Sequence, residues 1–219
     1  MYPLSTLRYS SAVSSYHHGN LRPALVEAAA ELARVAGPDG VVLREVARQT
    51  GVSHNAAYRH FADREALLHE VCTRAQSAVA RAIEAELAQV QDRDPAERAR
   101  ARFRAVGTGY VRFARAEPGL FRTAFFFPAD LRRSQSEEGA GDSGRNPFQL
   151  LSDALDEMRA ADLLDEPARQ GAEFVAWSAV HGLAILAISG PLRAMPAERL
   201  DELTAKLVAM VDKGLTSSG

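Results

Sequence analysis

Hydrophobic residues are spaced along the chain as in a series of amphipathic helices. From residue 21 onward, apolar side chains recur three or four positions apart, which places them on one face of an α-helix. No segment shows the sustained alternation of apolar and polar residues that marks a half-buried strand. The pattern predicts an all-α protein with about nine helices, at 21–36, 44–49, 53–60, 63 to about 90, 95 onward, 120–127, 147 onward, about 168–189 and about 197–213.

Capping and breaking residues mark where several of these helices begin and end. Gly37-Pro38 ends the first, because Gly suits a helix end and Pro cannot continue the helix. Asp63 is placed to cap the fourth, with Glu65 in the positive first turn. Asp94-Pro95-Ala96-Glu97 and Asn146-Pro147-Phe148-Gln149 each put a capping residue before a proline at the first helical position. These signals favour separate helices joined by short connections.

Two segments are predicted to lie outside regular structure. Residues 1–15 are rich in serine and aperiodic, so we expect a flexible N-terminal arm. Residues 129–145 combine charged residues with several Gly and Ser, and Leu131 is their only large apolar side chain. Such a stretch cannot bury much apolar surface, which predicts a solvated and mobile loop.

The composition is that of a protein with a packed core and no disulfide framework. Hydrophobic residues make up 47% of the 219 positions, which is enough to fill a core. Cys72 is the only cysteine, so a reducing, cytoplasmic setting is expected. The most apolar run, Phe174–Ile188, is shorter than the roughly 20 residues that span a bilayer, and no secretory signal is recognisable. We therefore predict a buried helix there and no membrane partner.

Charge is balanced over the whole chain but uneven along it. The formal net charge is −2 at pH 7. Residues 1–70 carry 7 Arg and 7 acidic residues, whereas residues 151–219 carry 6 basic and 11 acidic residues. The acidic C-terminal part disfavours contact with nucleic acid. Because the N-terminal part is not strongly basic either, any DNA binding must depend on where a few side chains are placed.

Residues 43–61 carry the spacing of a helix-turn-helix. The segment reads LREVARQTGVSHNAAYRHF, in which Ala47 is small enough for a second helix to cross closely. Gly51, four residues later, suits a tight turn with a positive φ. In a helix-turn-helix the second helix enters the major groove of DNA while neighbouring elements grip phosphates. The predicted core of the motif consists of Leu43, Val46, Val52, Ala56, Ala57 and Phe61.

The outward positions of the second helix are polar, as a DNA-reading surface requires. Ser and Asn can bond to base edges, and His and Tyr can bond to bases or phosphates. Arg64, at the start of the following helix, is predicted to meet a phosphate together with the backbone N–H groups there. The candidate DNA-binding residues are Arg44, Ser53, His54, Asn55, Tyr58, Arg59, His60 and Arg64.

Residues 16–70 resemble the N-terminal domain of the TetR family of transcriptional regulators. The likeness rests on YHHGNLRPALVEAAAELARVAG followed by VVLREVARQTGVSHNAAYRHFADREALLHEV. Farther along, WSAVHGLAIL resembles the Trp…His-Gly motif of one TetR subgroup's effector domain. The resemblance implies a DNA-binding domain at 16–62, after an arm at 1–15, and an effector-binding and dimerisation domain at 63–219.

The resemblance also implies how such a protein works. It describes a homodimeric, ligand-responsive DNA-binding protein, most often a repressor released from an inverted-repeat operator by a small, largely apolar effector. Tyr58 and Arg64 would hold phosphates, whereas Ser53, His54 and Asn55 would face bases. The helices at about 168–189 and 197–213 would form a four-helix interface with the same helices of a second copy. Burial of those helices within one chain stays open as the alternative.

The C-terminal half holds more aromatic residues than a slim helical bundle needs. These rings predict either an ordinary core or an apolar ligand site between helices, with a few polar groups for orientation. Trp177 and His181 are four residues apart and share a helix face, and the imidazole needs a partner. That partner is a ligand, a neighbouring side chain or a dimer mate. The candidate ligand-binding residues are Phe103, Tyr110, Phe113, Phe125, Met158, Trp177 and His181.

The sequence offers no recognisable site for catalysis, a metal or another cofactor. No carboxylate lies near His181 in the apolar run to orient it, and neither a Gly-x-Ser-x-Gly turn nor a phosphate-binding Gly loop occurs. The His and Cys spacings fit no usual metal site. We therefore predict a regulator that is not an enzyme. The alternative is a helical ligand-binding or interaction protein that does not bind DNA specifically.

Overall fold

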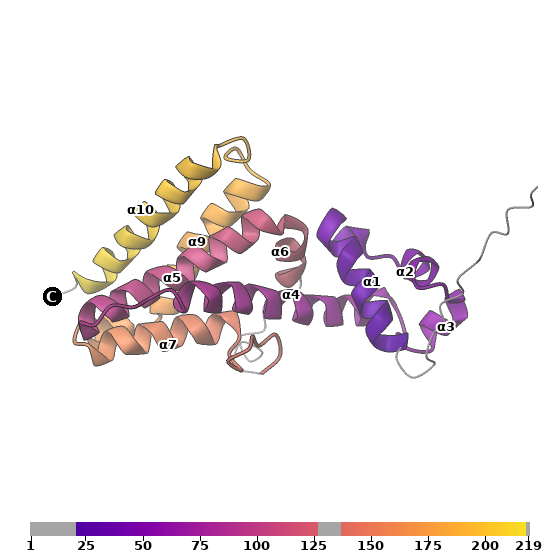
Figure 1. Cartoon of the computed structure of the whole chain (residues 1–219), viewed down its shortest axis with the longest axis horizontal. Helices are drawn as coiled ribbons and strands as arrows, with labels where there is room; N and C mark the ends of the chain where they lie inside the picture. Colours follow the sequence, from indigo (N-terminus) through magenta and orange to yellow (C-terminus); the bar gives the residue numbers. More distant parts are fainter. Residues whose placement is uncertain (1–20, 127–136, 218–219) are drawn as a thin grey trace, which may run out of the picture.

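The computed structural model describes residues 21–126 and 137–217, and these segments form ten α-helices, one short 3-10 helix and no strand. The first three α-helices lie at one end of an elongated molecule, and α4 runs from them into a helical bundle (Figure 1). The elements are α1 (Leu21–Ala36), η1 (Pro38–Gly40), α2 (Leu43–Gln49), α3 (His54–Tyr58), α4 (Arg64–Leu87), α5 (Pro95–Ala116), α6 (Pro118–Ala124), α7 (Pro147–Ala160), α8 (Glu166–Arg169), α9 (Ala172–Ile188) and α10 (Ala197–Thr216).

The predicted all-α class is confirmed, and the helix count differs from about nine at one place. The helix expected at 168–189 is divided into α8 and α9. Gly171 stands between them with φ 74°, a left-handed conformation that interrupts a helix and that Gly adopts without steric cost. The last helix passes its expected end at Gly214 and continues to Thr216, because Gly214 there keeps a helical φ.

The predicted N-caps are present. The Asp63 carboxylate accepts a hydrogen bond from the Ala66 backbone N–H at 2.8 Å, and Asp94 accepts one from Glu97 at 2.9 Å. Asn146 and the side chain of Gln149 each accept the other's backbone N–H at 2.9 Å, a reciprocal capping box. These local bonds fix where α4, α5 and α7 begin.

The loop predicted at 129–145 is only partly as expected. The arm at 1–15 and residues 129–136 lie outside the described residues. Residues 137–145 are non-helical, but they are fastened to α4, which corrects the expectation of a free, solvated loop. The Glu84 carboxylate accepts backbone N–H groups of Asp142 and Ser143, both at 2.9 Å, and also the Ser143 hydroxyl. Partial burial raises the pKa of Glu84, but these hydrogen bonds outweigh that effect and hold the pKa below its usual value.

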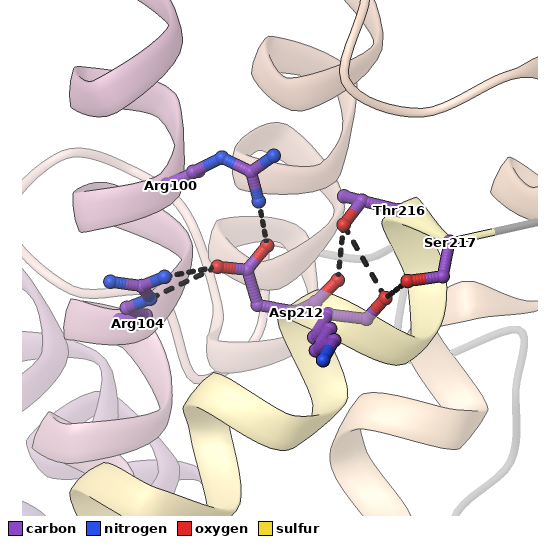
Figure 2. Close-up of polar contacts among 6 residues, drawn as sticks. Arg100, Arg104, Asp212, Thr216 and Ser217 are labelled. Carbon is purple, nitrogen blue, oxygen red and sulfur yellow. Dashed lines mark hydrogen bonds and ion pairs between the residues drawn. The ribbon is translucent and has the colours of Figure 1, made fainter.

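One continuous core joins both ends of the molecule. α4 packs against α1 at one end and against α5, α6 and α7 farther along. α5 in turn contacts α9 and α10, so it forms the centre of the bundle. α10 is tied to α5 by Asp212, whose buried carboxylate accepts hydrogen bonds from Arg100 and Arg104 (Figure 2). The core thus places α4 in contact with both halves.

Candidate functional site

α2 and α3 form a helix pair around a tight turn. Gly51 in the turn has φ 70°, as its position predicted. The Thr50 hydroxyl donates to the carbonyls of Val46 at 2.9 Å and Ala47 at 3.1 Å, which satisfies the end of α2. Ser53 caps α3 by accepting the Ala56 backbone N–H at 3.2 Å. Both helix ends are therefore closed by their own side chains.

The core beneath this helix pair is nearly the predicted one. Ala47 and Ala57 are buried where α2 and α3 cross, and Phe61 is buried beyond the end of α3. Val52 differs from the prediction in being only partly buried. The Arg22 guanidinium lies 4.4 Å from the centre of the Phe61 ring and donates to the His60 carbonyl at 2.7 Å. α1 thereby fixes the end of the helix pair.

The outer face of α3 is polar and open to solvent. Ser53, His54, Asn55, Tyr58 and Arg59 are all exposed. The His54 and Tyr58 rings meet edge to face, with their centroids 4.6 Å apart, so they share one side of the helix. Because the inner face is packed on α2, α3 presents these side chains at a fixed orientation.

The three remaining DNA-binding candidates have different surroundings. Arg44 is exposed on α2, and His60 is partly buried beyond the end of α3. Arg64 is partly buried, and its guanidinium donates to the carbonyls of Val41 at 2.7 Å and Pro38 at 2.5 Å. In this conformation Arg64 joins η1 to the start of α4 rather than extending toward a ligand. To contact a phosphate as expected, Arg64 would have to break these two hydrogen bonds and form new ones with the phosphate oxygens.

The bundle contains a connected cluster of aromatic side chains, which we call the aromatic cluster. Tyr110 of α5 lies at its centre, with its ring centroid 5.2 Å from that of Phe121 and 5.7 Å from that of Phe125. The Tyr110 hydroxyl accepts the Trp177 indole N–H at 3.0 Å and lies 2.8 Å from Nδ1 of His181. The members of the cluster are Tyr110, Phe121, Phe125, Phe148, Phe174, Trp177 and His181.

The candidate ligand residues divide between this cluster and the general core. Phe103 and Phe113 are buried on α5, and Met158 is buried on α7, but none of the three takes part in the described ring contacts of the cluster. Phe121, Phe148 and Phe174 belong to the cluster but are not among the candidate ligand-binding residues. Phe121 is fully buried on α6 beside Tyr110, and Phe148 was judged only as part of a helix start signal. No short-range pattern links either residue to Trp177.

One face of α9 is apolar and uncovered. Phe174, Val175, Ile185 and Leu186 are exposed large hydrophobic residues on this helix, with Val175 57% and Leu186 44% exposed. They lie at helical spacing on the face opposite the buried residues of α9. Gly182 falls within the same stripe, and a Cβ added there would meet nothing within 4 Å. The helix thus exposes a contiguous apolar stripe without a charged residue.

The described segments contain few features of other functional classes. Within residues 21–126 and 137–217, no three His, Cys, Asp or Glu side chains gather as they would around a metal ion. In the same segments, no helix has both the length and the apolar content for crossing a bilayer. Burial raises the pKa of the Cys72 thiol to about 12, which keeps it protonated.

Two family models match the chain. Residues 25–71 match "Bacterial regulatory proteins, tetR family", and residues 103–211 match "Tetracyclin repressor-like, C-terminal domain". A solved structure of a protein of unknown function from Rhodococcus sp. RHA1 is 30% identical, with a TM-score of 0.69, and the alignment covers 93% of this chain and 99% of that one. Among curated proteins, none matches the chain.

Two more distant structures share the fold. A transcriptional regulator from Rhodococcus sp. Rha1 is 21% identical, with a TM-score of 0.52 and coverage of 88% of this chain and 96% of that one. RolR, solved with its ligand resorcinol, is 19% identical, with a TM-score of 0.53 and coverage of 90% and 93%. At these identities the likeness concerns the fold alone.

Proposed function

Since the chain belongs to the TetR family of bacterial regulatory proteins, we propose that this ligand-responsive DNA-binding regulator is a repressor released from its operator by a small, largely apolar effector. The observation that carries the proposal is the outer face of α3, which is polar and exposed on a firmly packed helix pair. The protein acts in the cytoplasm, by binding alone and without catalysis. The domain division at residue 62 to 63 is part of this proposal.

The proposed DNA contacts follow from the position of each side chain on α3. Ser53, His54 and Asn55 lie at its N-terminal end, which enters the major groove and faces base edges. Tyr58 and Arg59 lie near its other end and bind phosphates, with Arg44 of α2 as a further phosphate contact. We now assign Arg64 to holding η1 against α4 until DNA competes for it.

We propose a homodimer through α9 and α10. The uncovered apolar stripe on α9 supports it, because a monomer gains nothing by exposing four large hydrophobic residues on one helix face. Gly182 lets a second helix approach this stripe closely. On α10, Met210 is a further exposed large apolar side chain, at 63%. A twofold dimer then places two α3 helices to read the two halves of an inverted repeat.

In this proposal, the conformational change caused by effector binding is transmitted to α3 through α6 and α4. Cys72 and Gln76 of α4 donate to the carbonyls of Thr123 and Ala124 at the end of α6, both at 2.9 Å. α6 carries Phe121 of the aromatic cluster. At its other end Gly119 lies against the C-terminal turn of α1. An effector that fits one arrangement of α6 better than another shifts the separation of the two reading helices.

Gly119→Ala is expected to weaken operator binding about tenfold. A Cβ at residue 119 would lie 2.2 Å from the Arg34 carbonyl oxygen and 2.3 Å from that of Ala33, so α6 and α1 must move apart. Such overpacking costs about 1–3 kcal/mol. Operator affinity is measured by fluorescence anisotropy, with dimer mass checked by light scattering. Ala85→Ser, at an exposed position of α4, is the control and should bind normally. Unchanged affinity in Gly119→Ala would remove this contact from the coupling route.

The function is tested by selecting binding sites from random DNA with purified protein at two salt concentrations. An inverted repeat recovered at both salts supports a dimeric, sequence-specific regulator. If a folded dimer recovers nothing, and still recovers nothing after denaturation and refolding away from any bound ligand, the protein is a ligand-binding module without specific DNA binding.

Asn55→Ala sharpens this test on the selected repeat. It should lose discrimination at one base position of each half-site by roughly 1–3 kcal/mol while keeping non-specific affinity. Arg59→Ala is the matched variant, which should weaken binding to all sequences alike and reduce the slope of affinity against salt by about one. Competition binding with single-base variants of the repeat measures both. Unaltered base preference in Asn55→Ala would remove this residue from the reading set.

A further inference from the structure

A short chain of polar groups runs through the aromatic cluster. The Trp177 indole N–H donates to the Tyr110 hydroxyl oxygen at 3.0 Å, and that oxygen lies 2.8 Å from Nδ1 of His181. An indole nitrogen can only donate, so the Tyr110 oxygen must accept from it. The single hydroxyl hydrogen of Tyr110 is then free to be donated to His181.

The direction of these hydrogen bonds, from Trp177 to Tyr110 and from Tyr110 to His181, determines which imidazole nitrogen carries the hydrogen. Burial lowers the pKa of His181, so its ring is neutral near pH 7. Burial raises the pKa of Tyr110, so the hydroxyl keeps its hydrogen. Nδ1 of His181 therefore accepts from Tyr110, and the ring hydrogen resides on Nε2.

Nε2 of His181 is not fully buried and lies beside apolar rings. Within residues 21–126 and 137–217, His181 makes no other hydrogen bond and no fully buried side-chain nitrogen lacks a partner, so Nε2 keeps some contact with solvent. The His181 ring centroid lies 5.4 Å from that of Phe125 and 5.9 Å from that of Trp177, both partly exposed. The described contacts of the cluster include no Arg or Lys side chain. The site thus offers one N–H donor on an apolar, uncharged surface.

We propose that the effector is an uncharged, largely apolar molecule whose carbonyl or ether oxygen accepts a hydrogen bond from Nε2 of His181. This inference rests on the proposed function only in calling the ligand an effector. Aromatic rings also attract cations. However, an ammonium group has only N–H donors to offer, and it would meet the Nε2 hydrogen of His181. The donor therefore selects against the cationic class that the rings alone would favour.

The first test observes the tautomer directly. In protein labelled with ¹⁵N-histidine, His181 should show a protonated Nε2 and an unprotonated, hydrogen-bonded Nδ1 near pH 7. Its signals are assigned by their loss in His181→Gln. In Tyr110→Phe the two tautomers should mix, because Nδ1 loses its donor. A wild-type His181 protonated on Nδ1 overturns the proposal, and the tautomer itself is read from the wild-type spectrum.

The second test compares three probes that share one carbon skeleton: acetophenone, ethylbenzene and 1-phenylethylammonium. Trp177 is the only tryptophan and belongs to the aromatic cluster, so saturable changes in its fluorescence report on this site. Acetophenone should bind about three- to tenfold more tightly than ethylbenzene, the effect of one hydrogen bond, and the cation more weakly than both. In Tyr110→Phe, the ratio of the acetophenone affinity to the ethylbenzene affinity should fall toward one. Equal binding of the two neutral probes, preference for the cation, or no binding of any probe overturns the proposal.

Neither readout involves DNA, which separates this inference from the proposed function. If acetophenone is preferred but no inverted repeat is ever selected, the proposed ligand class is supported and the proposed regulatory function is wrong. If an inverted repeat is selected but the probes bind equally, the proposed regulatory function is supported and the proposed ligand class is wrong.

Discussion

Leu186→Asp is expected to convert the protein into a folded monomer that no longer binds the inverted repeat. Leu186 is 44% exposed in the apolar stripe of α9, so a single chain tolerates a carboxylate there. In the proposed dimer the same carboxylate would be buried against the partner's apolar stripe, which costs several kcal/mol. The dissociation constant of the dimer should therefore rise by about two orders of magnitude or more. Sedimentation velocity measures the mass, and anisotropy with the selected repeat measures DNA binding.

Ala85→Asp is the matched control for this prediction. Ala85 is exposed on α4 outside the apolar stripe, and the variant introduces the same charge on a helix surface. It should remain a dimer and bind the repeat as the wild type does. A Leu186→Asp protein that stays dimeric would show that α9 is not the interface and that its apolar face has another partner.

The helix-turn-helix could be predicted from sequence because its determinants are local. Gly51 adopts the positive φ that its place in the turn required, and Asp63 caps α4 as expected. In each case the interacting groups lie within four residues of one another, so the spacing along the chain determines the geometry. The same holds for the capping box of Asn146 and Gln149, which fixes the start of α7.

The aromatic cluster was less predictable because its contacts are long-range. The sequence placed Trp177 and His181 on one helix face and left the partner of the imidazole open. The structure supplies a neighbouring side chain, Tyr110, which is 71 residues away in the chain. Phe121 joins the cluster only because α6 packs against α5, a contact that no spacing in the sequence reveals. Arg64 likewise meets carbonyls more than 20 residues away.

Asp212 makes another long-range contact, a buried ion pair with two arginines of α5. Its side chain is 1% exposed and accepts from Nη1 of Arg100 at 2.6 Å and from Nε and Nη2 of Arg104 at 3.0 and 2.6 Å. Figure 2 shows both guanidinium groups directed from α5 at this one carboxylate of α10. Two cations thus stabilise a single buried anion, and the pair of helices is held at this point.

Asp212→Asn is expected to lower the free energy of unfolding by about 2 to 3 kcal/mol. Breaking a buried ion pair costs about 3–5 kcal/mol when a charge is left without compensation. The cost is smaller here, because the two remaining arginines are partly exposed and can be solvated. Urea denaturation at one fixed protein concentration measures the change, since dimerisation makes stability depend on concentration.

Asp201→Asn provides the matched comparison, because Asp201 also lies on α10 and also pairs with an arginine of α5. Its side chain is 48% exposed, and its partner is Arg115. An exposed pair of this kind contributes at most about 1 kcal/mol and is weakened by salt. The loss in Asp212→Asn should therefore exceed that in Asp201→Asn and persist at high salt. Equal losses in the two variants would mean that burial adds nothing to the Asp212 contact, and α10 would then be held to α5 by its apolar residues alone.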